Sequence, residues 1–118
     1  MTGFIAGEAH FQDVLFKECN GSFAQFRFAS FQRVHFVNCN LVEADFQEAD
    51  LSGVNFVNCN LSRADMSKAK LNGVDLRSSQ IEGLHIGAQE IQGAIINPTQ
   101  AVALVQALGV IVKWPSEE

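Results

Sequence analysis

Large apolar residues occupy every fifth position of this chain from Phe11 to Ile96, with Gly21 as the one exception. A small or β-branched residue stands two positions before almost all of them, as Ala44 stands before Phe46. An α-helix would place apolar residues about every 3.6 positions, and a half-buried strand about every second position. A strict period of five fits neither element, so it indicates a solenoid built from a short repeated turn-and-bridge unit.

A longer repeat of 20 residues lies above the period of five. The residues at the small positions run Val, Cys, Ala, Ala and then begin again, and Phe-Val-Asn-Cys-Asn-Leu occurs at both 36–41 and 56–61. Four pentads therefore form one coil with a square cross-section. Adjacent coils should pair their backbones as in a parallel sheet, about 4.8 Å apart. We expect Phe36 and Phe56 to stack in one interior column.

Individual pentads carry a resemblance to a known family. Ala44–Glu48, Ala49–Gly53 and Cys59–Arg63 each read as a small residue, Asp or Asn, Leu or Phe, and two variable residues. In this pattern the chain resembles the pentapeptide-repeat proteins over residues 9–96. The resemblance implies an all-β fold, a right-handed quadrilateral parallel β-helix.

The chain changes character after Asn97. Asn97 followed by Pro98 is typical of a helix start, apolar residues at helical spacing follow, and Gly109 is typical of a helix end. Residues 110–114 then read as a short terminal strand. The predicted organisation is an N-terminal lead-in at 1–8, a β-helix at 9–97, and a capping helix with a dimerisation strand at 98–118.

The spacing of reactive side chains argues against an enzyme. The three histidines fall at outward positions on three different faces, so they cannot converge on one metal or substrate. The three cysteines follow one another at intervals of 20 residues and point inward, which favours packed thiols over a disulfide or a zinc site. We find no Ser-His-Asp set and no glycine-rich phosphate loop. We therefore expect no catalytic, metal-binding or cofactor-binding residues.

Composition excludes two further classes of partner. No apolar run approaches the length of a membrane span, and the N-terminus lacks the layout of a secretory signal. The net charge is −5, and there is no basic patch with interleaved aromatic residues. We expect a cytoplasmic protein that binds neither membranes nor nucleic acid directly.

Acidic residues are the first candidate for a partner-binding surface. Several of them lie 20 residues from a base, where opposite charges on adjacent coils contribute up to about 1 kcal/mol. These pairs are Glu43 with Arg63, Glu48 with Lys68, and Asp50 with Lys70. Asp45 instead falls over Asp65, and Asp75 continues the negative charge toward the C-terminus. Two interpretations stay open for Asp45, Asp65 and Asp75: a solvated surface, or an acidic surface that binds a partner.

Apolar residues at outward positions are the second candidate. Val37 and Val57 should face outward together on adjacent coils and form a contact strip. Phe23 and Phe28 are also predicted to lie outside. Phe23 follows Gly21, and it could fold inward to fill the space that the glycine leaves.

The segment Ala107–Val112 is similar to the C-terminal tail of the Qnr and MfpA quinolone-resistance members of the family. This resemblance implies a homodimer joined through the C-termini, a rod that mimics DNA, binds DNA gyrase or another topoisomerase and modulates quinolone sensitivity. Trp114 would reach the second copy. The candidate interface residues are Leu108, Val110, Ile111, Val112 and Trp114. The alternative is a structural or protein-interaction module with an unrelated protein partner, contacted through Val37 and Val57.

Overall fold

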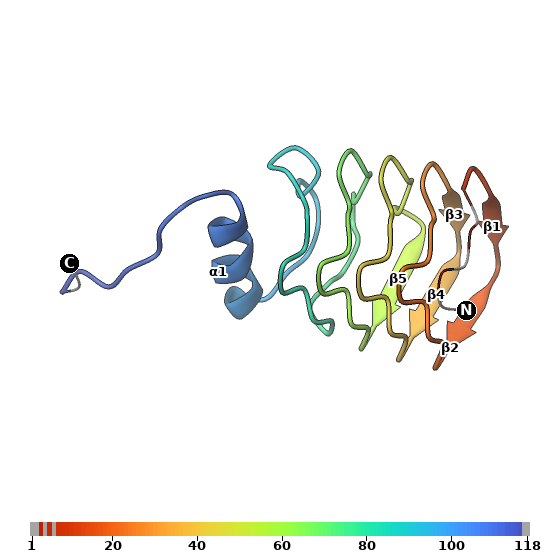
Figure 1. The fold of residues 1–118 in the computed structure, drawn as a ribbon, viewed down its shortest axis with the longest axis horizontal. Coiled ribbons are helices and arrows are strands. Elements are labelled where there is room, and N and C mark those ends of the chain that lie inside the picture. The colour runs from red at the N-terminus through yellow and green to blue at the C-terminus, as the bar shows by residue number, and fades with distance from the viewer. Residues whose placement is uncertain (1–2, 4, 6, 117–118) are drawn as a thin grey trace.

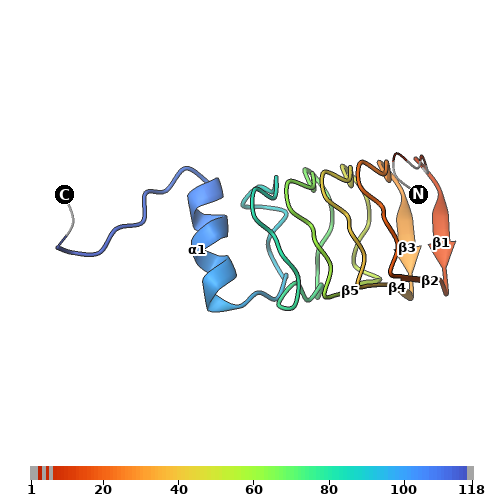
Figure 2. The ribbon, with the colours of Figure 1, turned by 60° about the horizontal axis from the view of Figure 1, so that its bottom comes forward.

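The chain forms a stack of coils with a helix across one end. The computed structural model describes residues 3, 5 and 7–116. The coils follow one another along the long axis of the molecule, and α1 (Pro98–Ala107) lies across the last of them (Figure 1). The molecule extends 49 Å along this axis and 25 and 21 Å across it. The residues after α1 lead away from the stack, as both views show (Figure 2).

Parallel backbone pairing joins each coil to the next. Within the described residues the strands are β1 (His10–Gln12), β2 (Leu15–Lys17), β3 (Ser30–Gln32), β4 (Val34–Val37) and β5 (Val54–Val57). β1 pairs with β3, while β4 lies between β2 and β5, and partners such as Phe36 and Phe56 are 20 residues apart. Single bridges carry the same offset into later coils, as between Asp65 and His85. The predicted 20-residue coil is therefore confirmed.

The large apolar residue of each pentad lies inside the stack. Phe36 and Phe56 are each 1% exposed, and their rings stack with centroids 5.6 Å apart and planes 15° from parallel. Phe46 meets Phe56 edge to face at 6.1 Å. Rings in one column therefore stack, while rings in adjacent columns meet at their edges, which are the two arrangements that aromatic pairs prefer.

The inward-facing cysteines form a column of buried thiols. Cys39 and Cys59 are each 2% exposed, and their Sγ atoms donate to the carbonyl oxygens of Phe16 and Phe36, at 3.2 and 3.1 Å. Burial raises the pKa of both thiols above the ordinary value. Because the thiolate is the reactive form, these cysteines are poor nucleophiles.

We expect alkylation of the native protein to discriminate among the cysteines. Cys19, in the first coil, is partly exposed, so iodoacetamide should label it well before Cys39 and Cys59. Peptide mapping by mass spectrometry would measure the three rates. In denaturant the rates should become similar, and native labelling of Cys59 as fast as that of Cys19 would contradict the buried column.

Each pentad ends in a corner that needs a left-handed backbone. Non-glycine residues at these corners have φ values from 51° to 64°, and Gly73 and Gly83 serve the same position with φ of 77° and 69°. Glycine adopts this region without steric cost, whereas bulky side chains are uncommon there. Phe23 and Phe28 occupy two such corners and are 55% and 50% exposed. The prediction that both lie outside is confirmed.

Phe23 does not fill the space beside Gly21. A Cβ atom at residue 21 would lie 2.7 Å from Cδ2 of Leu41, so a side chain from the next coil already occupies this space. The idea that Phe23 folds inward is therefore wrong, because Leu41 reaches the position first.

Both ends of the stack differ from the prediction. Ile5 pairs with Gln25, so the parallel pairing extends into segment 1–8, which the sequence assigned to a lead-in. No strand forms over residues 110–114. A strand requires a hydrogen-bonded partner, and α1 separates this segment from the backbone pairing of the last coil. The terminal strand predicted from β-branched residues is therefore absent from the single chain.

Candidate protein-interaction surfaces

The candidate acids first serve the turns in which they lie. Oδ1 of Asp45, Asp65 and Asp75 each accepts the backbone N–H two residues further on, at 2.9 Å in all three cases. Asp and Asn side chains stabilise tight turns by this contact. One carboxylate oxygen of each candidate therefore has a structural role, and a partner could compete only for the other.

The three acids do not form one surface. Asp45 and Asp65 pair on adjacent coils, as the sequence predicts, but Asp75 belongs to a separate ladder in which its partner is Ile95. Arg27 Nη2 lies 3.2 Å from Asp45 Oδ2, and Arg77 Nη2 lies 2.8 Å from Asp75 Oδ2. Arginine thus neutralises two of the three acids.

The predicted charge pairs across coils are confirmed in part. Arg63 Nε lies 3.7 Å from Glu43 Oε1. Within the part of the chain that the structure describes, no ion pair joins Glu48 to Lys68 or Asp50 to Lys70. Asp50 Oδ1 instead accepts both the N–H and the hydroxyl of Ser52, at 3.1 and 2.6 Å. The local turn contact therefore replaces the expected contact between coils.

Arg77 determines the ionisation of Asp75. Hydrogen bonds from the Arg77 guanidinium, and then from its backbone N–H, lower the pKa of Asp75 from 3.8 to about 2. A carboxyl group with a lowered pKa in the folded state stabilises that state above its unfolded pKa. This contribution is complete above about pH 4 and is lost as the pH falls through about 2.

We expect the Arg77→Gln variant to raise the pKa of Asp75 toward 3.8, but not fully to it. The guanidinium is lost, while the backbone N–H of residue 77 still donates to Oδ1. Carboxyl ¹³C NMR titration would measure the change. Arg27→Gln is the matched control and should leave Asp75 unaffected. An unchanged pKa in Arg77→Gln would contradict the pairing.

The valine strip is narrow. Val37 and Val57 are register partners in β4 and β5, and both are half-buried. Val57 lines a hollow of about 350 Å³ together with Asp75 and Arg77. The structure thus brings a candidate valine and a candidate acid together, with an arginine between them that the sequence reasoning did not consider.

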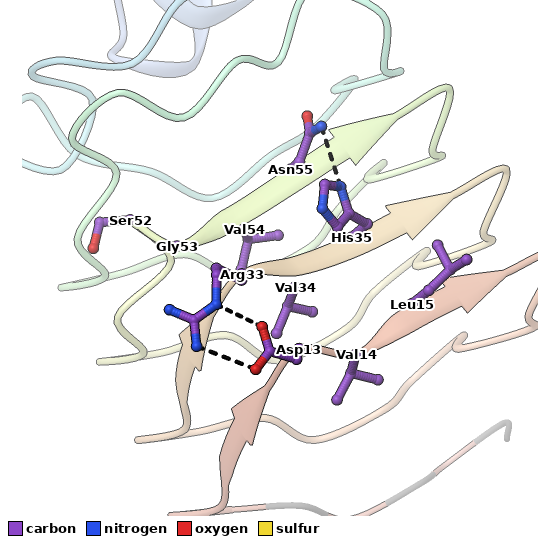
Figure 3. A pocket seen from close by; sticks show the side chains of 10 residues that line it. All are labelled: Asp13, Val14, Leu15, Arg33, Val34, His35, Ser52, Gly53, Val54 and Asn55. Atoms are coloured by element: carbon purple, nitrogen blue, oxygen red, sulfur yellow. Dashed lines mark hydrogen bonds and ion pairs between the residues drawn. The ribbon is translucent and has the colours of Figure 1, made fainter.

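The largest hollow runs over the corner that joins β1 to β2 and β3 to β4 (Figure 3). It measures about 630 Å³, and Arg33 donates from Nε and Nη2 to Asp13 at 2.5 and 3.1 Å on its wall. This hydrogen bonding lowers the pKa of Asp13 and raises that of Arg33. At Gly53 any side chain would collide with the carbonyl oxygen of Phe31, so the close approach of two coils requires glycine there.

This hollow has no arrangement for catalysis. His35 meets Asn55 at 3.4 Å, and the hydroxyl of Ser52 donates to Asp50 rather than to a histidine. Among residues 3, 5 and 7–116, no group of three or more His, Cys, Asp or Glu side chains is placed to hold a metal ion. None of the described helical residues forms a segment with the length and apolarity that a membrane crossing demands.

The start of α1 is fixed to the last coils by two side chains. Asn97 Oδ1 accepts the N–H of Gln100 at 2.8 Å, and Gln100 Oε1 accepts the N–H of Asn97 at 2.9 Å, which forms a capping box. Gln100 is buried, and its Nε2 donates to the carbonyls of Leu76 and Ser79. The predicted N-cap is confirmed. The role of Gln100 was missed, although its spacing from Asn97 could have revealed it.

α1 covers the end of the core incompletely. Leu104 is buried, but Val105 and Leu108, which belong to the predicted apolar stripe, are 38% and 48% exposed. A cavity of about 200 Å³ lies between the helix and the last coil. Its lining residues are apolar and come from both elements: Ile86, Gly87, Ile91, Ile96, Ala101, Leu104, Val105 and Leu108.

The candidate dimer residues lie on the segment that leaves α1. Gly109, with a φ of 87°, ends the helix as predicted. Beyond it, Ile111 is 79% exposed and Trp114 is 76% exposed. The structure therefore places the candidate residues together on one extended, apolar tail, whose members are Leu108, Val110, Ile111, Val112 and Trp114.

Comparisons with known proteins identify the repeat. The sequence profile of pentapeptide repeats matches residues 7–41 and 39–77, with eight copies. A search of curated protein sequences finds no significant match.

Solved structures show the same fold. HetL of the cyanobacterium Nostoc sp. strain PCC 7120, a pentapeptide-repeat protein involved in heterocyst differentiation regulation, is 23% identical with a TM-score of 0.65 over 81% of this chain and 48% of HetL. The chain thus spans about half the length of HetL. A pentapeptide-repeat protein of the Arabidopsis thaliana thylakoid lumen is 23% identical with a TM-score of 0.62 over 90% of this chain and 77% of that one. The fluoroquinolone resistance protein QnrB1 is 20% identical over 91% of this chain and 71% of its own, with a TM-score of 0.37, which carries no argument.

Proposed function

Because the chain belongs to the pentapeptide-repeat family, we propose that it is a non-catalytic protein-binding rod in which two copies join through their C-terminal tails. The observation that carries this proposal is the apolar tail beyond α1. Solvent-exposed apolar surface of this extent is costly on a single soluble chain, and it marks an interaction site. A symmetric pairing of two tails would remove the same surface from water on both copies.

The mixed charge of the coil faces supports a partner that recognises a polar protein surface. A DNA mimic presents a continuous negative stripe, whereas here arginines neutralise Asp45, Asp75 and Glu43. The interaction module with an unrelated partner is therefore the better supported of the two functions. Binding of DNA gyrase in place of DNA stays a prediction.

Two further parts of the proposal concern shape and location. The 20-residue coil of four pentads supports a four-sided cross-section, and we infer its right-handed sense from the family resemblance. The buried column of free thiols is compatible with a reducing compartment, so we propose a cytoplasmic location.

Sedimentation velocity at micromolar concentration tests the joining of two copies. A main boundary at the mass of two chains supports the proposal, and a monomer boundary that persists as the concentration rises overturns it. Pull-down with purified gyrase subunits at low and moderate salt tests the mimic. Binding that weakens steeply with salt would favour mimicry, because electrostatic attraction between exposed charges is screened.

A further inference from the structure

We infer that Trp114 of a second copy fills the apolar cavity between α1 and the last coil, so that each protomer completes the core of the other. This inference rests on the proposed dimer and adds the site at which the tail docks. The ligand is the indole side chain of another copy of this chain.

The core needs such a completion at this end. In the middle of the stack, Met66, Leu71 and Leu76 are 0–1% exposed. The residues that follow them in the same columns, Ile86, Ile91 and Ile96, are only partly buried and line the cavity. Because α1 covers these isoleucines incompletely, apolar core surface stays in contact with water in the single chain.

The cavity suits an aromatic ring in size and chemistry. It measures about 200 Å³, and all of its lining side chains are apolar. An apolar cavity of roughly 150 Å³ in another protein binds benzene, so this one can accept the larger indole. Trp114, the one tryptophan of the sequence, is also the largest exposed side chain of the tail. The indole N–H would stay at the cavity mouth, where water can accept its hydrogen bond.

The direction of the tail favours a second copy over insertion into the same chain. Beyond Gly109 the chain leads away from α1 and from the stack, so Trp114 does not approach its own cavity (Figures 1 and 2). The exposed apolar groups of the tail and α1 offer on the order of 500 Å² per copy, hence about 1,000 Å² in a symmetric pair. This area reaches the lower bound of a specific interface, which is about 1,000 Å².

Tryptophan fluorescence over a dilution series tests the inference on the unmodified chain, with the mass measured in parallel by sedimentation. The emission should be blue-shifted and protected from acrylamide while the dimer persists. Both properties should be lost together with the dimer mass. Trp114→Ala should weaken the dimer about 1,000-fold, because each of the two identical contacts contributes about 30-fold, the lower limit for a central interface residue.

A variant that fills the cavity tests the docking site without altering the tail. Ala101 lines the cavity, so Ala101→Phe should expel the indole, shift its emission to the red and weaken the dimer about 30-fold or more. Ala107→Phe is the matched control: it lies on the same helix, is exposed and does not line the cavity. It should leave the emission unchanged.

Three outcomes overturn the inference. A dimer whose Trp114 emission does not change on dissociation would remove the docking site and leave the proposed dimer intact. Blue-shifted emission in a monomer at every concentration would assign the indole to its own cavity. A monomer with red-shifted emission at every concentration would overturn the proposed dimer together with the inference.

Discussion

Replacement of Phe56 by alanine should lower the free energy of unfolding by about 3–5 kcal/mol. The Phe56 side chain is 1% exposed, stacks on Phe36 at 5.6 Å and meets Phe46 edge to face. Its removal would leave a cavity in the third coil, and the rigid stacking of coils limits collapse around it. Because domains of this size are stable by only about 5–15 kcal/mol, the variant should unfold at much lower denaturant concentration.

Urea denaturation followed by circular dichroism would measure this loss. Phe28→Ala is the matched control, because Phe28 is 50% exposed at a coil corner. We expect the control to change stability by no more than about 0.5 kcal/mol. If Phe56→Ala unfolded at the same urea concentration as the parent, the interior position of Phe56 would be wrong.

Ile111→Asp should convert the proposed dimer into a folded monomer. Burial of an isoleucine side chain contributes about 1.5–3 kcal/mol, and a symmetric interface loses this contribution twice. The dissociation constant should therefore rise at least about 100-fold, and the desolvation of two aspartates would add to this. The coil stack should stay intact, since Ile111 is 79% exposed on the tail and lies outside the core. Sedimentation velocity and thermal unfolding would measure the two effects.

Ile5→Asp is the control for the tail substitution. Ile5 is the same residue type, is 71% exposed and lies at the opposite end of the stack, where it pairs with Gln25. A general effect of added charge on association would appear in both variants. An effect confined to Ile111→Asp supports the tail as the interface, whereas equal dissociation by both variants would contradict it.

The interior of the fold follows from the sequence because its rule is periodic. A pentad contributes one large and one small inward residue, so counting alone places Phe36 over Phe56 and Asp45 over Asp65. A slip of one residue would move apolar side chains into water along the whole stack. Such a repeat is therefore as readable in the sequence as in the structure.

The outer surface does not follow from the same rule. Arg27 pairs with Asp45 at a separation of 18 residues, and Arg77 pairs with Asp75 at a separation of two. Long flexible side chains reach diagonal and local partners, so counting by 20 predicted only the contact of Glu43 with Arg63 among the proposed pairs. The charge of the candidate acids thus depends on rotamers that the repeat does not encode.

The C-terminal end was predictable in its helix and not in its tail. Asn97 and Pro98 mark the helix start through local chemistry, and the capping box confirms it. Residues 110–114 have the composition of a strand, but a strand exists only where another backbone pairs with it. Composition therefore identified the tail as apolar, and the cavity beside α1 became visible only from the packing of the last coil.

Small-angle X-ray scattering at micromolar concentration tests the central claim most directly, because it reports mass and length together. Two copies joined through their tails predict the mass of two chains and a maximum dimension well beyond the 49 Å of one copy. A particle with the mass of one chain and a maximum dimension near 49 Å would contradict the joined rod. Two chains in a compact particle would contradict the tail as the point of contact.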